Sequence, residues 1–295
     1  MEQKILNVSS VGIVLRPQST HIKPIFLELK KHLELASINV MLEYSGARML
    51  ELTTAVASHD IQYICEHADM LLSIGGDGTL LSVARQSYGS NVPILGINSG
   101  RLGYLTIALP HEIDSVVERI KNGDYAINKH LMLEGYVQES VGLEIMRPFV
   151  ALNEFLLSRA GVSGMLEIEA SINGVLFNHY RLDGLLVATP TGSSAYNVSA
   201  GGSLVYPHCR NVLLTPICAH ALTQRPIILD DSFAIEFKFK TPGTLICDGQ
   251  QRVSVPEGSV ICIKAATHNA HLVELTPNFY FMRLREKLGW GQIDN

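Results

Sequence analysis

The stretch that most constrains the fold is an apolar run at residues 70–74, followed at once by Gly75-Gly76-Asp77-Gly78 and by helical spacing over residues 79–86. This order predicts a buried strand, a tight turn and a helix. We expect the glycines to adopt positive φ and to let the backbone approach a ligand, while the helix start favours an anion such as phosphate. A carboxylate among phosphate oxygens is repulsive unless it meets a hydroxyl proton or a metal ion, so Asp77 indicates a reaction rather than binding alone.

The glycine segment does not match the common phosphate-binding motifs. A Walker loop ends in Gly-Lys-Ser/Thr, which is absent, and the dinucleotide fingerprint requires a glycine where this chain has Leu81. A purely structural turn is therefore an alternative interpretation of this segment taken by itself.

The first third of the chain alternates short apolar runs with helical patterns, which predicts right-handed βαβ units and a parallel sheet. The expected strands are residues 11–15, 38–42, 70–74 and 92–97, and the expected helices are residues 24–35, 61–67, 79–86 and 110–121. Because ligands bind at the carboxyl ends of such strands, we expect the glycine segment and the loop at residues 98–104 to share one edge of the sheet.

After residue 124 the pattern changes to strands with few helices. The strand-like runs are residues 149–158, 166–172, 175–177, 184–188, 233–239, 245–247, 253–255, 260–263 and 272–275. Asn173-Gly174 is a strong hairpin signal, and Asp248-Gly249-Gln250 is explained by a hairpin turn alone. We therefore expect an α/β domain with a parallel sheet at residues 1–126, a β-rich, sandwich-like domain at residues 127–270, and a segment at residues 271–295, helical over 279–288, that packs back on the first domain.

The composition and net charge of the chain limit the kinds of binding partner that it can have. The 295 residues are 47% hydrophobic with a formal net charge of -5, so no global basic field indicates nucleic acid. The amino terminus lacks a leader pattern and no apolar run approaches the ~20 residues of a membrane helix, so we expect a cytoplasmic protein without a membrane partner. Five scattered cysteines form neither a disulfide framework nor a metal motif, and eleven histidines lack ligand spacing, so no protein metal site is expected.

Two further stretches concentrate polar side chains. In residues 183–202 a buried strand ends in Thr-Pro-Thr-Gly, after which Ser193 or Ser194 can cap a helix, and more small hydroxyl residues gather there than capping requires. It is not a serine-hydrolase elbow, because the closing glycine is missing. Asn153-Glu154 places an amide and a carboxylate within an apolar run, where burial is costly without partners. This pattern indicates a ligand contact, with a solvent-exposed strand edge as the alternative.

Together, segments 75–78, 98–105, 153–154 and 183–202 resemble the ordered motif set of the bacterial NAD kinase family, and Lys287-Leu288-Gly289-Trp290 is similar to the ending of proteobacterial members. The resemblance implies ATP-dependent phosphorylation of the 2′-hydroxyl of the adenosine ribose of NAD, which gives NADP. It also implies Mg²⁺ or another divalent cation with ATP, dinucleotide binding by the second domain, and a homodimer or homotetramer with sites near subunit contacts.

The resemblance implies roles for individual residues. Asp77 would be the general base or the group that orients the hydroxyl, and Gly75, Gly76, Gly78 and Thr79 would hold the phosphates of ATP. The implied NAD contacts are Asp77, Gly78, Tyr104, Asn153, Glu154, Arg181, Asp183, Ser194, Ala195, Tyr196, Asn197, Val198, Ser199 and Gln250. The chain departs from the family in its Ser158-Arg159-Ala160-Gly161 loop, at Gly164, at Tyr104 in place of phenylalanine and at Ser194 in place of threonine.

Two other functions are compatible with parts of the sequence. Kinases that phosphorylate a lipid or a sugar phosphate share a Gly-Gly-Asp-Gly turn, but the stretch at residues 183–202 argues against them. A non-catalytic dinucleotide sensor would keep the binding residues, whereas the presence of Asp77 argues for catalysis. An assay for NADP with ATP, Mg²⁺ and NAD separates these possibilities.

Overall fold

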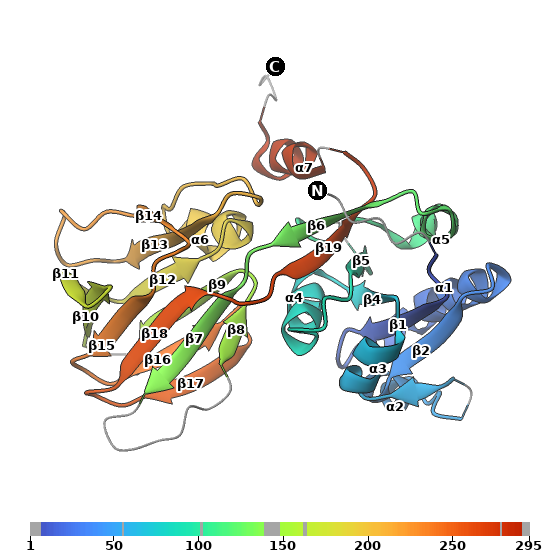
Figure 1. Ribbon diagram of the computed structural model, residues 1–295, viewed down its shortest axis with the longest axis horizontal. Coiled ribbons are helices and arrows are strands. Elements are labelled where there is room, and N and C mark those ends of the chain that lie inside the picture. The colour runs from blue at the N-terminus through green and yellow to red at the C-terminus, as the bar shows by residue number, and fades with distance from the viewer. Residues whose placement is uncertain are drawn as a thin grey trace. The chain divides into compact units, whose positions relative to one another are not determined.

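The computed structural model describes residues 7–54, 56–100, 103–138, 148–161, 164–277 and 279–290. The chain divides into two units, one formed by residues 1–129 and 270–295 and the other by residues 130–269. The first unit combines helices with a sheet, whereas the described part of the second is built mainly of strands (Figure 1). No helix within these ranges is long and apolar enough to cross a lipid bilayer.

The first unit is built on a seven-stranded sheet in the order β3-β2-β1-β4-β5-β19-β6. Neighbouring strands from β3 to β19 in this order pair in parallel, which confirms the predicted parallel sheet. The strands are β1 (Ser10–Leu15), β2 (Asn39–Glu43), β3 (Ser58–His59), β4 (Met70–Gly75), β5 (Ile94–Asn98), β6 (Ala126–His130) and β19 (Ala270–Glu274).

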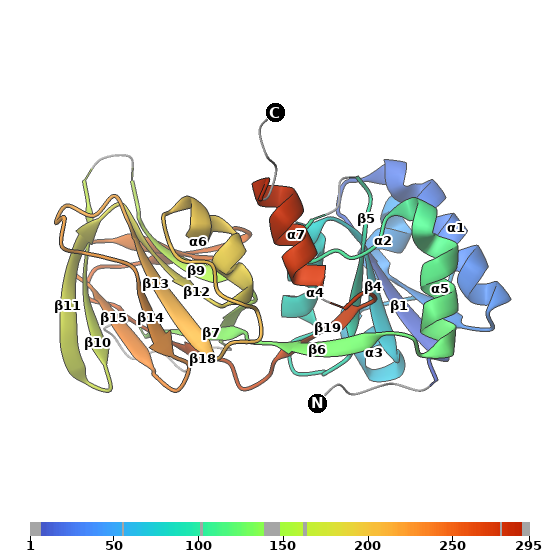
Figure 2. The same cartoon turned by 90° about the horizontal axis from the view of Figure 1, so that it is seen from above.

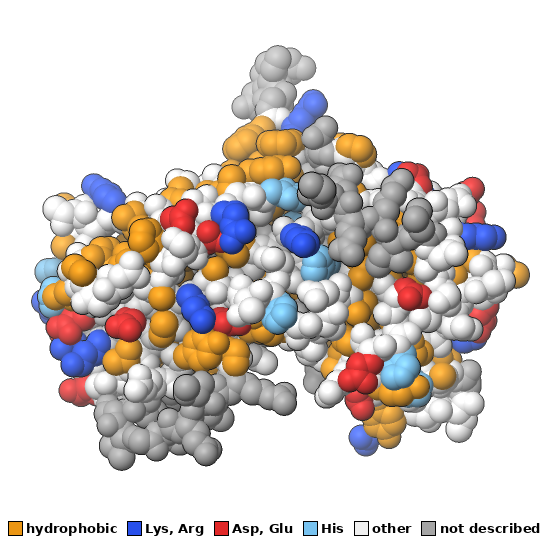
Figure 3. Space-filling model, viewed as in Figure 1, with side chains coloured by type: hydrophobic (Ala, Val, Ile, Leu, Met, Phe, Trp, Pro, Cys, Tyr) orange, Lys and Arg blue, Asp and Glu red, His pale blue; other side chains and the backbone are white. Residues whose placement is uncertain are grey.

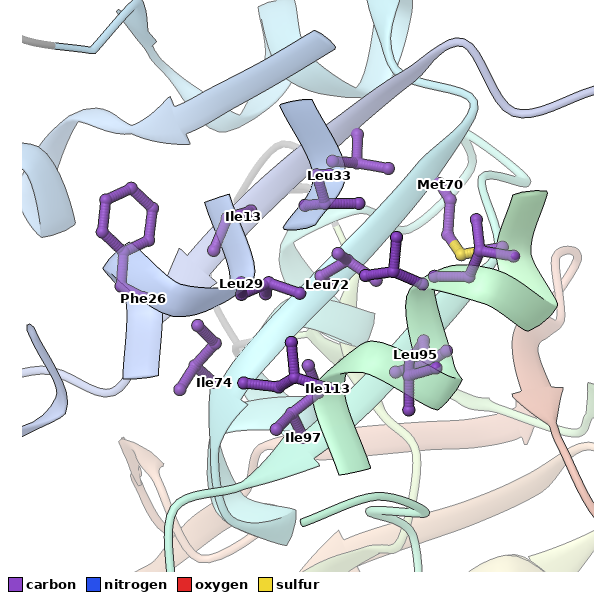
Figure 4. Close-up of a cluster of buried hydrophobic side chains, with 14 of the residues drawn as sticks. Ile13, Phe26, Leu29, Leu33, Met70, Leu72, Ile74, Leu95, Ile97 and Ile113 are labelled. Carbon is purple, nitrogen blue, oxygen red and sulfur yellow. The ribbon is translucent and has the colours of Figure 1, made fainter. Parts of the chain in front are cut away.

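Helices cover both faces of this sheet. On one face, Phe26 of α1 and Ile113 of α5 pack on β-strand side chains such as Leu72 (Figure 4). On the other face, Gly12 and Gly96 leave room for the helices α3 and α4, because a Cβ at Gly12 would lie 2.0 Å from Ile64 and one at Gly96 would lie 2.8 Å from Leu80. The helical segments of this unit are η1 (Thr20–Ile22), α1 (Lys23–Leu35), α2 (Tyr44–Met49), α3 (Ile61–His67), α4 (Asp77–Gln86), η2 (Pro110–Glu112), α5 (Ile113–Asn122) and α7 (Phe279–Leu288).

The strand β19 belongs to the first unit. The run at residues 272–275 forms this strand beside β5, with Leu272 opposite Ile94. Its consecutive residues Ala270 to Val273 are all buried, as in a parallel strand covered on both faces. The chain therefore returns to the first unit before it forms α7.

The second unit contains two six-stranded sheets, in the orders β11-β10-β15-β18-β7-β8 and β14-β13-β12-β9-β16-β17. Their strand pairs are antiparallel. Figure 2 shows the strands of this unit from above. The strands are β7 (Leu133–Gln138), β8 (Phe149–Ala151), β9 (Glu154–Arg159), β10 (Leu166–Ile172), β11 (Val175–Leu182), β12 (Gly184–Ala188), β13 (Asn211–Ile217), β14 (Ile227–Asp230), β15 (Ile235–Phe239), β16 (Gly243–Cys247), β17 (Gln251–Val255) and β18 (Val260–Ala265).

Local sequence signals explain several of these elements. In β15 the side chains of Ile235, Phe237 and Phe239 are buried and their neighbours face solvent, as the alternation predicts. Asn173 and Gly174 join β10 to β11 with φ values of 51° and 77°, which confirms the predicted hairpin turn. In the view of Figure 3, acidic and basic side chains are interspersed on the surface.

The run at residues 149–158 is not one strand. It forms β8 in one sheet and β9 in the other, and the chain crosses between the sheets at residues 152–153. This crossing presents Asn153 and Glu154 at the beginning of β9, where the second cluster of candidate site residues lies.

Candidate active site

The glycine segment lies at the junction of β4 and α4. The helix begins at Asp77, two residues before the predicted start, with Gly76 as its N-cap at a φ of −136°. Gly75, Gly76 and Gly78 all lie outside the positive-φ region, so the expectation of left-handed backbone is wrong. Position 75 requires glycine because a larger residue would not fit: a Cβ there would lie 2.2 Å from the hydroxyl oxygen of Thr79.

Two backbone N–H groups in the first turn of α4 already have a hydrogen-bond acceptor within the protein. Thr79 N–H donates to the carbonyl oxygen of Gly76 at 2.9 Å, and Leu80 N–H donates to the same oxygen at 3.2 Å. Open space lies at Gly76, where the nearest heavy atom to an added Cβ would be 3.8 Å away. A ligand can therefore approach the backbone at Gly76 more closely than at Gly75.

The carboxylate of Asp77 is held by the loop that follows β5. Its Oδ2 accepts a hydrogen bond from Tyr104 N–H at 2.7 Å. Its Oδ1 accepts bonds from Leu105 N–H at 3.2 Å, Thr106 N–H at 3.0 Å and the Thr106 hydroxyl at 2.9 Å. As predicted, the glycine segment and the loop after β5 meet at the carboxyl edge of the sheet. The bonds fix the orientation of Asp77.

Thr106 is a central residue of this loop that the sequence did not single out. Its side chain is completely buried, and its hydroxyl oxygen accepts bonds from Asn98 Nδ2 at 3.0 Å and Gly103 N–H at 3.2 Å while it donates to Asp77. A lone threonine in a loop gives no sequence signal for such a role. Thr106 thus links the end of β5 to the carboxylate at the start of α4.

The backbone around Tyr104 packs closely on Asp77. A Cβ at Gly103 would lie 2.1 Å from one oxygen of the Asp77 carboxylate, so a larger residue would displace that group. The Tyr104 side chain is half-buried, and burial, followed by the negative charge of Asp77, raises the pKa of its phenol. The aromatic side chain therefore lies within the electrostatic influence of the candidate base.

In the second unit, one carboxylate organises the crossing between β8 and β9. Asp248 Oδ1 accepts hydrogen bonds from the N–H groups of Asn153 at 2.8 Å and Glu154 at 3.1 Å, and its Oδ2 accepts one from Leu152 N–H at 3.1 Å. Sequence reasoning explained Asp248 by the β16–β17 turn alone and missed this function. The clue that was available is the position of Asp248 two residues before Gln250, which the resemblance had placed in the site.

Glu154 is a buried carboxyl group in this cluster. Its side chain is 7% exposed, so the alternative of a solvent-exposed strand edge is wrong for this residue. Its Oε2 atom has no hydrogen-bond partner among the described residues. Burial, and secondly the charge of Asp248, raise the pKa of Glu154 to about 8. A buried polar atom without a partner is suited to a ligand that brings a polar hydrogen or a lone pair.

The Thr-Pro-Thr-Gly segment after β12 lies directly on this crossing. Thr189 N–H donates to the carbonyl oxygen of Asn153 at 2.8 Å, and the Thr189 hydroxyl donates to that of Leu152 at 2.6 Å. A Cβ at Gly192 would lie 2.1 Å from the Asn153 carbonyl oxygen. Only glycine fits there, so this segment and the Asn153-Glu154 pair form one structural unit.

The helical segment after Gly192 differs from the prediction. It consists of η3 (Thr191–Ser194) and α6 (Tyr196–Ser199), and no serine side chain caps either one. The Ser193 hydroxyl instead bonds to the N–H and the carbonyl oxygen of Val205, both at 3.0 Å. The expectation of a serine cap is therefore wrong, because a buried hydroxyl here connects two backbone segments.

Asn197, one of the predicted NAD contacts, is fully buried. Its Nδ2 donates to the carbonyl oxygens of Ser193 at 3.2 Å and Ser203 at 3.0 Å, and its Oδ1 accepts from the Thr215 hydroxyl at 2.6 Å. Its side chain therefore holds α6 against β13. Tyr196, by contrast, is 45% exposed on the first turn of α6 and is accessible to a ligand.

The other predicted contacts differ in accessibility. Ser194, Ala195 and Val198 are half-buried, and Ser199 is exposed. Gln250 is exposed in the turn between β16 and β17, two residues beyond Asp248.

Arg181 and Asp183 lie away from this cluster. Arg181 is exposed near the end of β11, and Asp183 precedes β12, where its carboxylate is 3.6 Å from Arg159. Glu154 pairs with Ala188 at the opposite end of β12. Ala188 lies five residues after Asp183, so at about 3.3 Å per residue the two positions are roughly 16 Å apart. The structure therefore does not bring Arg181 and Asp183 together with Glu154 in one copy of the chain.

The fold and these groups define a class of protein. A carboxylate held in a fixed orientation at the carboxyl edge of a parallel sheet can accept a hydroxyl proton, and the start of α4 can face phosphate oxygens. The second unit adds a buried carboxyl group and a hydroxyl-rich turn of the kind that bind a polar ligand. These properties place the chain among the nucleotide-binding phosphotransferases.

Comparison with known proteins identifies the family within this class. Residues 11–125 match the ATP-NAD kinase N-terminal domain and residues 152–275 match the ATP-NAD kinase C-terminal domain. The chain is 44% identical to the NAD kinase of Wolinella succinogenes, over 98% of both chains, and 40% identical to that of Helicobacter hepaticus, over 97% of both. The chain belongs to the NAD kinase family.

Solved structures agree with this assignment. Yeast NADH kinase complexed with NADH superposes with a TM-score of 0.89 at 26% identity, covering 98% of this chain and 90% of that one. An NAD kinase from Archaeoglobus fulgidus in complex with ATP gives a TM-score of 0.73 at 25% identity, covering 95% and 98%.

Proposed function

We propose that this chain transfers the terminal phosphoryl group of ATP to the 2′-hydroxyl of the adenosine ribose of NAD, which gives NADP. The observation that carries the proposal is the match of both units, in order, to the two ATP-NAD kinase domains. The fixed carboxylate at the edge of the parallel sheet supplies a group with the chemistry that the reaction needs.

Asp77 acts as the general base or orients the acceptor hydroxyl. Oδ1 accepts three of the hydrogen bonds from residues 105–106, and Oδ2 accepts one from Tyr104. A carboxylate oxygen has two lone pairs, so Oδ2 is the oxygen better placed to receive a hydroxyl proton. The loop holds this oxygen in place before the substrate arrives, which lowers the cost of reaching the reactive geometry.

The phosphates of ATP are proposed to bind at Gly75, Gly76, Gly78 and Thr79, where the space at Gly76 admits a close approach. Among the described residues of this turn, Asp77 is the only carboxylate, and it accepts hydrogen bonds from residues 104–106. Mg²⁺ would arrive with ATP, be held by the phosphate oxygens and neutralise their charge.

The NAD molecule is proposed to bind the second unit through Asn153, Glu154, Gln250 and residues 194–199, with Tyr104 and Gly78 contributing from the first unit. The buried Oε2 of Glu154 gains a partner when a ribose hydroxyl reaches it. The exposed ring of Tyr196 offers an apolar surface to a base. Asn197 contributes mainly by keeping α6 in place.

We further propose that the enzyme is a homodimer or homotetramer, and that Arg181 and Asp183 contact the dinucleotide bound by another copy. Their separation from Glu154 along β12 supports this arrangement. The strand β11 is the edge of its sheet, and its residues Val175 and Leu176 are 68% and 49% exposed. An exposed apolar edge strand favours burial against a partner. Light scattering of the purified protein measures the oligomeric state, and a monomer at assay concentrations contradicts this proposal.

We place the enzyme in the cytoplasm. No disulfide joins any of the five cysteines, all of which lie in the described part of the chain, as is usual in a reducing compartment.

The activity test incubates the purified protein with ATP, Mg²⁺ and NAD and detects NADP with an NADP-specific dehydrogenase. Omission of ATP is the control, and a parallel reaction replaces NAD with NADH. Formation of NADP only in the presence of ATP is the expected result. Binding of NAD by calorimetry without formation of NADP would instead indicate a dinucleotide sensor.

A further inference from the structure

The turn between β16 and β17 contains more than a hairpin signal requires. An Asp-Gly turn is satisfied by its backbone conformation, with Asp248 and Gly249 at φ values of 47° and 67°. Yet the side chain of Asp248 is 6% exposed and points into the protein. A buried carboxylate is costly unless it is hydrogen-bonded, so its position calls for a function beyond the turn.

We propose that Asp248 is a positioning residue for NAD binding: it holds the backbone of Asn153 and Glu154 and, through its negative charge, keeps the Glu154 carboxyl group neutral, so that Glu154 meets the ribose as a hydrogen-bond donor. This inference rests on the proposed function of the chain as an NAD kinase. It adds a role to a residue that does not itself contact the substrate.

The first part of the proposal, that Asp248 holds the backbone of Asn153 and Glu154, rests on hydrogen bonds. One carboxylate accepts the three consecutive N–H groups of residues 152–154 at 2.8–3.1 Å. Asp248 N–H donates in return to the carbonyl oxygen of Glu154 at 2.9 Å. These bonds lie where the chain leaves one sheet and enters the other, so the N–H groups at the crossing depend on Asp248 for an acceptor. Removal of the carboxylate would release the Asn153-Glu154 pair.

The second part of the proposal, that Asp248 keeps Glu154 neutral, rests on the residues around Glu154. On β12 its opposite residue is Ala188, and on β16 the neighbouring titratable residue, Cys247, lies in the hydrophobic core. Asp248, at the end of β16, therefore supplies the charge that acts on Glu154 among the described residues.

Across the two sheets, the β7 residue Gly135 packs against Phe155. Its neighbour Glu134 is thus on the opposite face of β7, where it accepts hydrogen bonds from the Tyr136 hydroxyl and Thr267 N–H. Glu134 therefore faces away from Glu154 and does not replace Asp248 as the source of negative charge.

Two carboxyl groups in one buried cluster do not ionise together readily. The Asp248 carboxylate accepts hydrogen bonds from three N–H groups, whereas Oε2 of Glu154 has no partner among the described residues. The proton therefore resides on Glu154, whose pKa is raised to about 8. A neutral Glu154 is also compatible with the negative pyrophosphate of NAD, whereas an ionised one would add repulsion.

The test is Asp248→Asn, which keeps a residue that tolerates positive φ but removes the charge and one acceptor. We expect the KM for NAD to rise about tenfold to a hundredfold, the effect of losing a hydrogen bond to a charged group, while kcat changes much less. In the wild type, we expect KM to rise as the pH passes about 8, because Glu154 ionises there. Without the charge of Asp248, Glu154 ionises more easily, so this rise moves to lower pH.

Two further variants complete the design. Asp230→Asn is the matched control, because the Asp230 carboxylate accepts Ser232 N–H at 3.0 Å in another turn of the same unit; its KM and pH profile should match the wild type. Glu154→Gln removes the ionisable group, so the rise in KM near pH 8 should disappear. In the double variant Asp248→Asn/Glu154→Gln, the effects should combine less than multiplicatively, since the residues act through one interaction.

A wild-type KM and pH profile in Asp248→Asn would overturn the proposal. So would persistence of the rise near pH 8 in Glu154→Gln, a result that can be obtained even if Asp248→Asn does not fold. Formation of NADP by the wild type in the same experiment tests the proposed function separately. If the wild type makes NADP and the variants behave like it, the proposed function holds and the role of Asp248 is wrong.

Discussion

Thr106→Val tests the arrangement that orients Asp77. Valine has nearly the volume of threonine, so the substitution leaves the packing in place and removes only the hydroxyl group. That hydroxyl donates to Asp77 and accepts from Asn98 Nδ2 and Gly103 N–H in a completely buried position. The substitution therefore deletes three hydrogen bonds at once.

The expected cost follows from these partners. A hydrogen bond to a charged group contributes about 1.5–3 kcal/mol, and a buried donor left without an acceptor costs about 1–3 kcal/mol. Asn98 is buried at 7% exposure, whereas Gly103 is half-buried and can bond to water. Taking the lower part of each range, we expect about 3 kcal/mol of destabilisation, which lowers Tm by about 6–12 °C in a domain of this size.

Turnover should fall together with stability, because Asp77 loses one of the bonds that fix its Oδ1. A misplacement of about 1 Å at a reacting group costs up to about a hundredfold in rate, so we expect a loss of about tenfold to a hundredfold in kcat. Thr106→Ser is the control: it keeps the hydroxyl, removes one methyl group, and should cost only about 1 kcal/mol.

Calorimetric unfolding and the NADP assay, run on both variants, measure these effects. A Thr106→Val protein that unfolds at the wild-type temperature and turns over at the wild-type rate would refute the reasoning. So would equal losses in Thr106→Val and Thr106→Ser, since the methyl group and not the hydroxyl would then be responsible.

Four further substitutions test the site. Asp77→Asn should keep NAD affinity within about an order of magnitude and reduce kcat about 10²- to 10⁴-fold, the usual contribution of a general base; near-normal turnover of the purified variant rules out that role. Tyr196→Ala should weaken NAD binding without altering the circular dichroism spectrum, and unchanged affinity by calorimetry contradicts the ring contact. Gly75→Ala should destabilise the protein by about 1–3 kcal/mol through the clash with Thr79, whereas Gly76→Ala, which has open space, should unfold nearly as the wild type does.

Much of the fold could be predicted from the chain itself. The hydrophobic pattern predicted a strand at residues 70–74, which the structure has as β4, the helices α1, α3 and α5, and the alternation in β15, because burial on one or both faces leaves a repeating pattern. The hairpin at Asn173-Gly174 followed from residues that tolerate positive φ. These are local rules, and a local rule applies wherever the neighbours in space do not override it.

The predictions from sequence are wrong where residues far away in the chain determine the local structure. The apolar run at residues 149–158 is divided between two sheets because the carboxylate of Asp248, almost a hundred positions away, accepts the N–H groups at the crossing. Ser193 is not a cap because its hydroxyl bonds to Val205 instead.

The sequence alone determined the two-part architecture, the junction of strand and helix that carries Asp77, and the ordered motifs of the family, since these depend on residue type and spacing. Only the tertiary structure decided which atoms hold the functional groups. It showed that Thr106 fixes Asp77, that Asp248 holds Glu154, and that Gly75 is required for space rather than for a positive φ. Hydrogen bonds between residues far apart in the chain leave no periodic trace in the sequence, so their partners become visible only when the chain is folded.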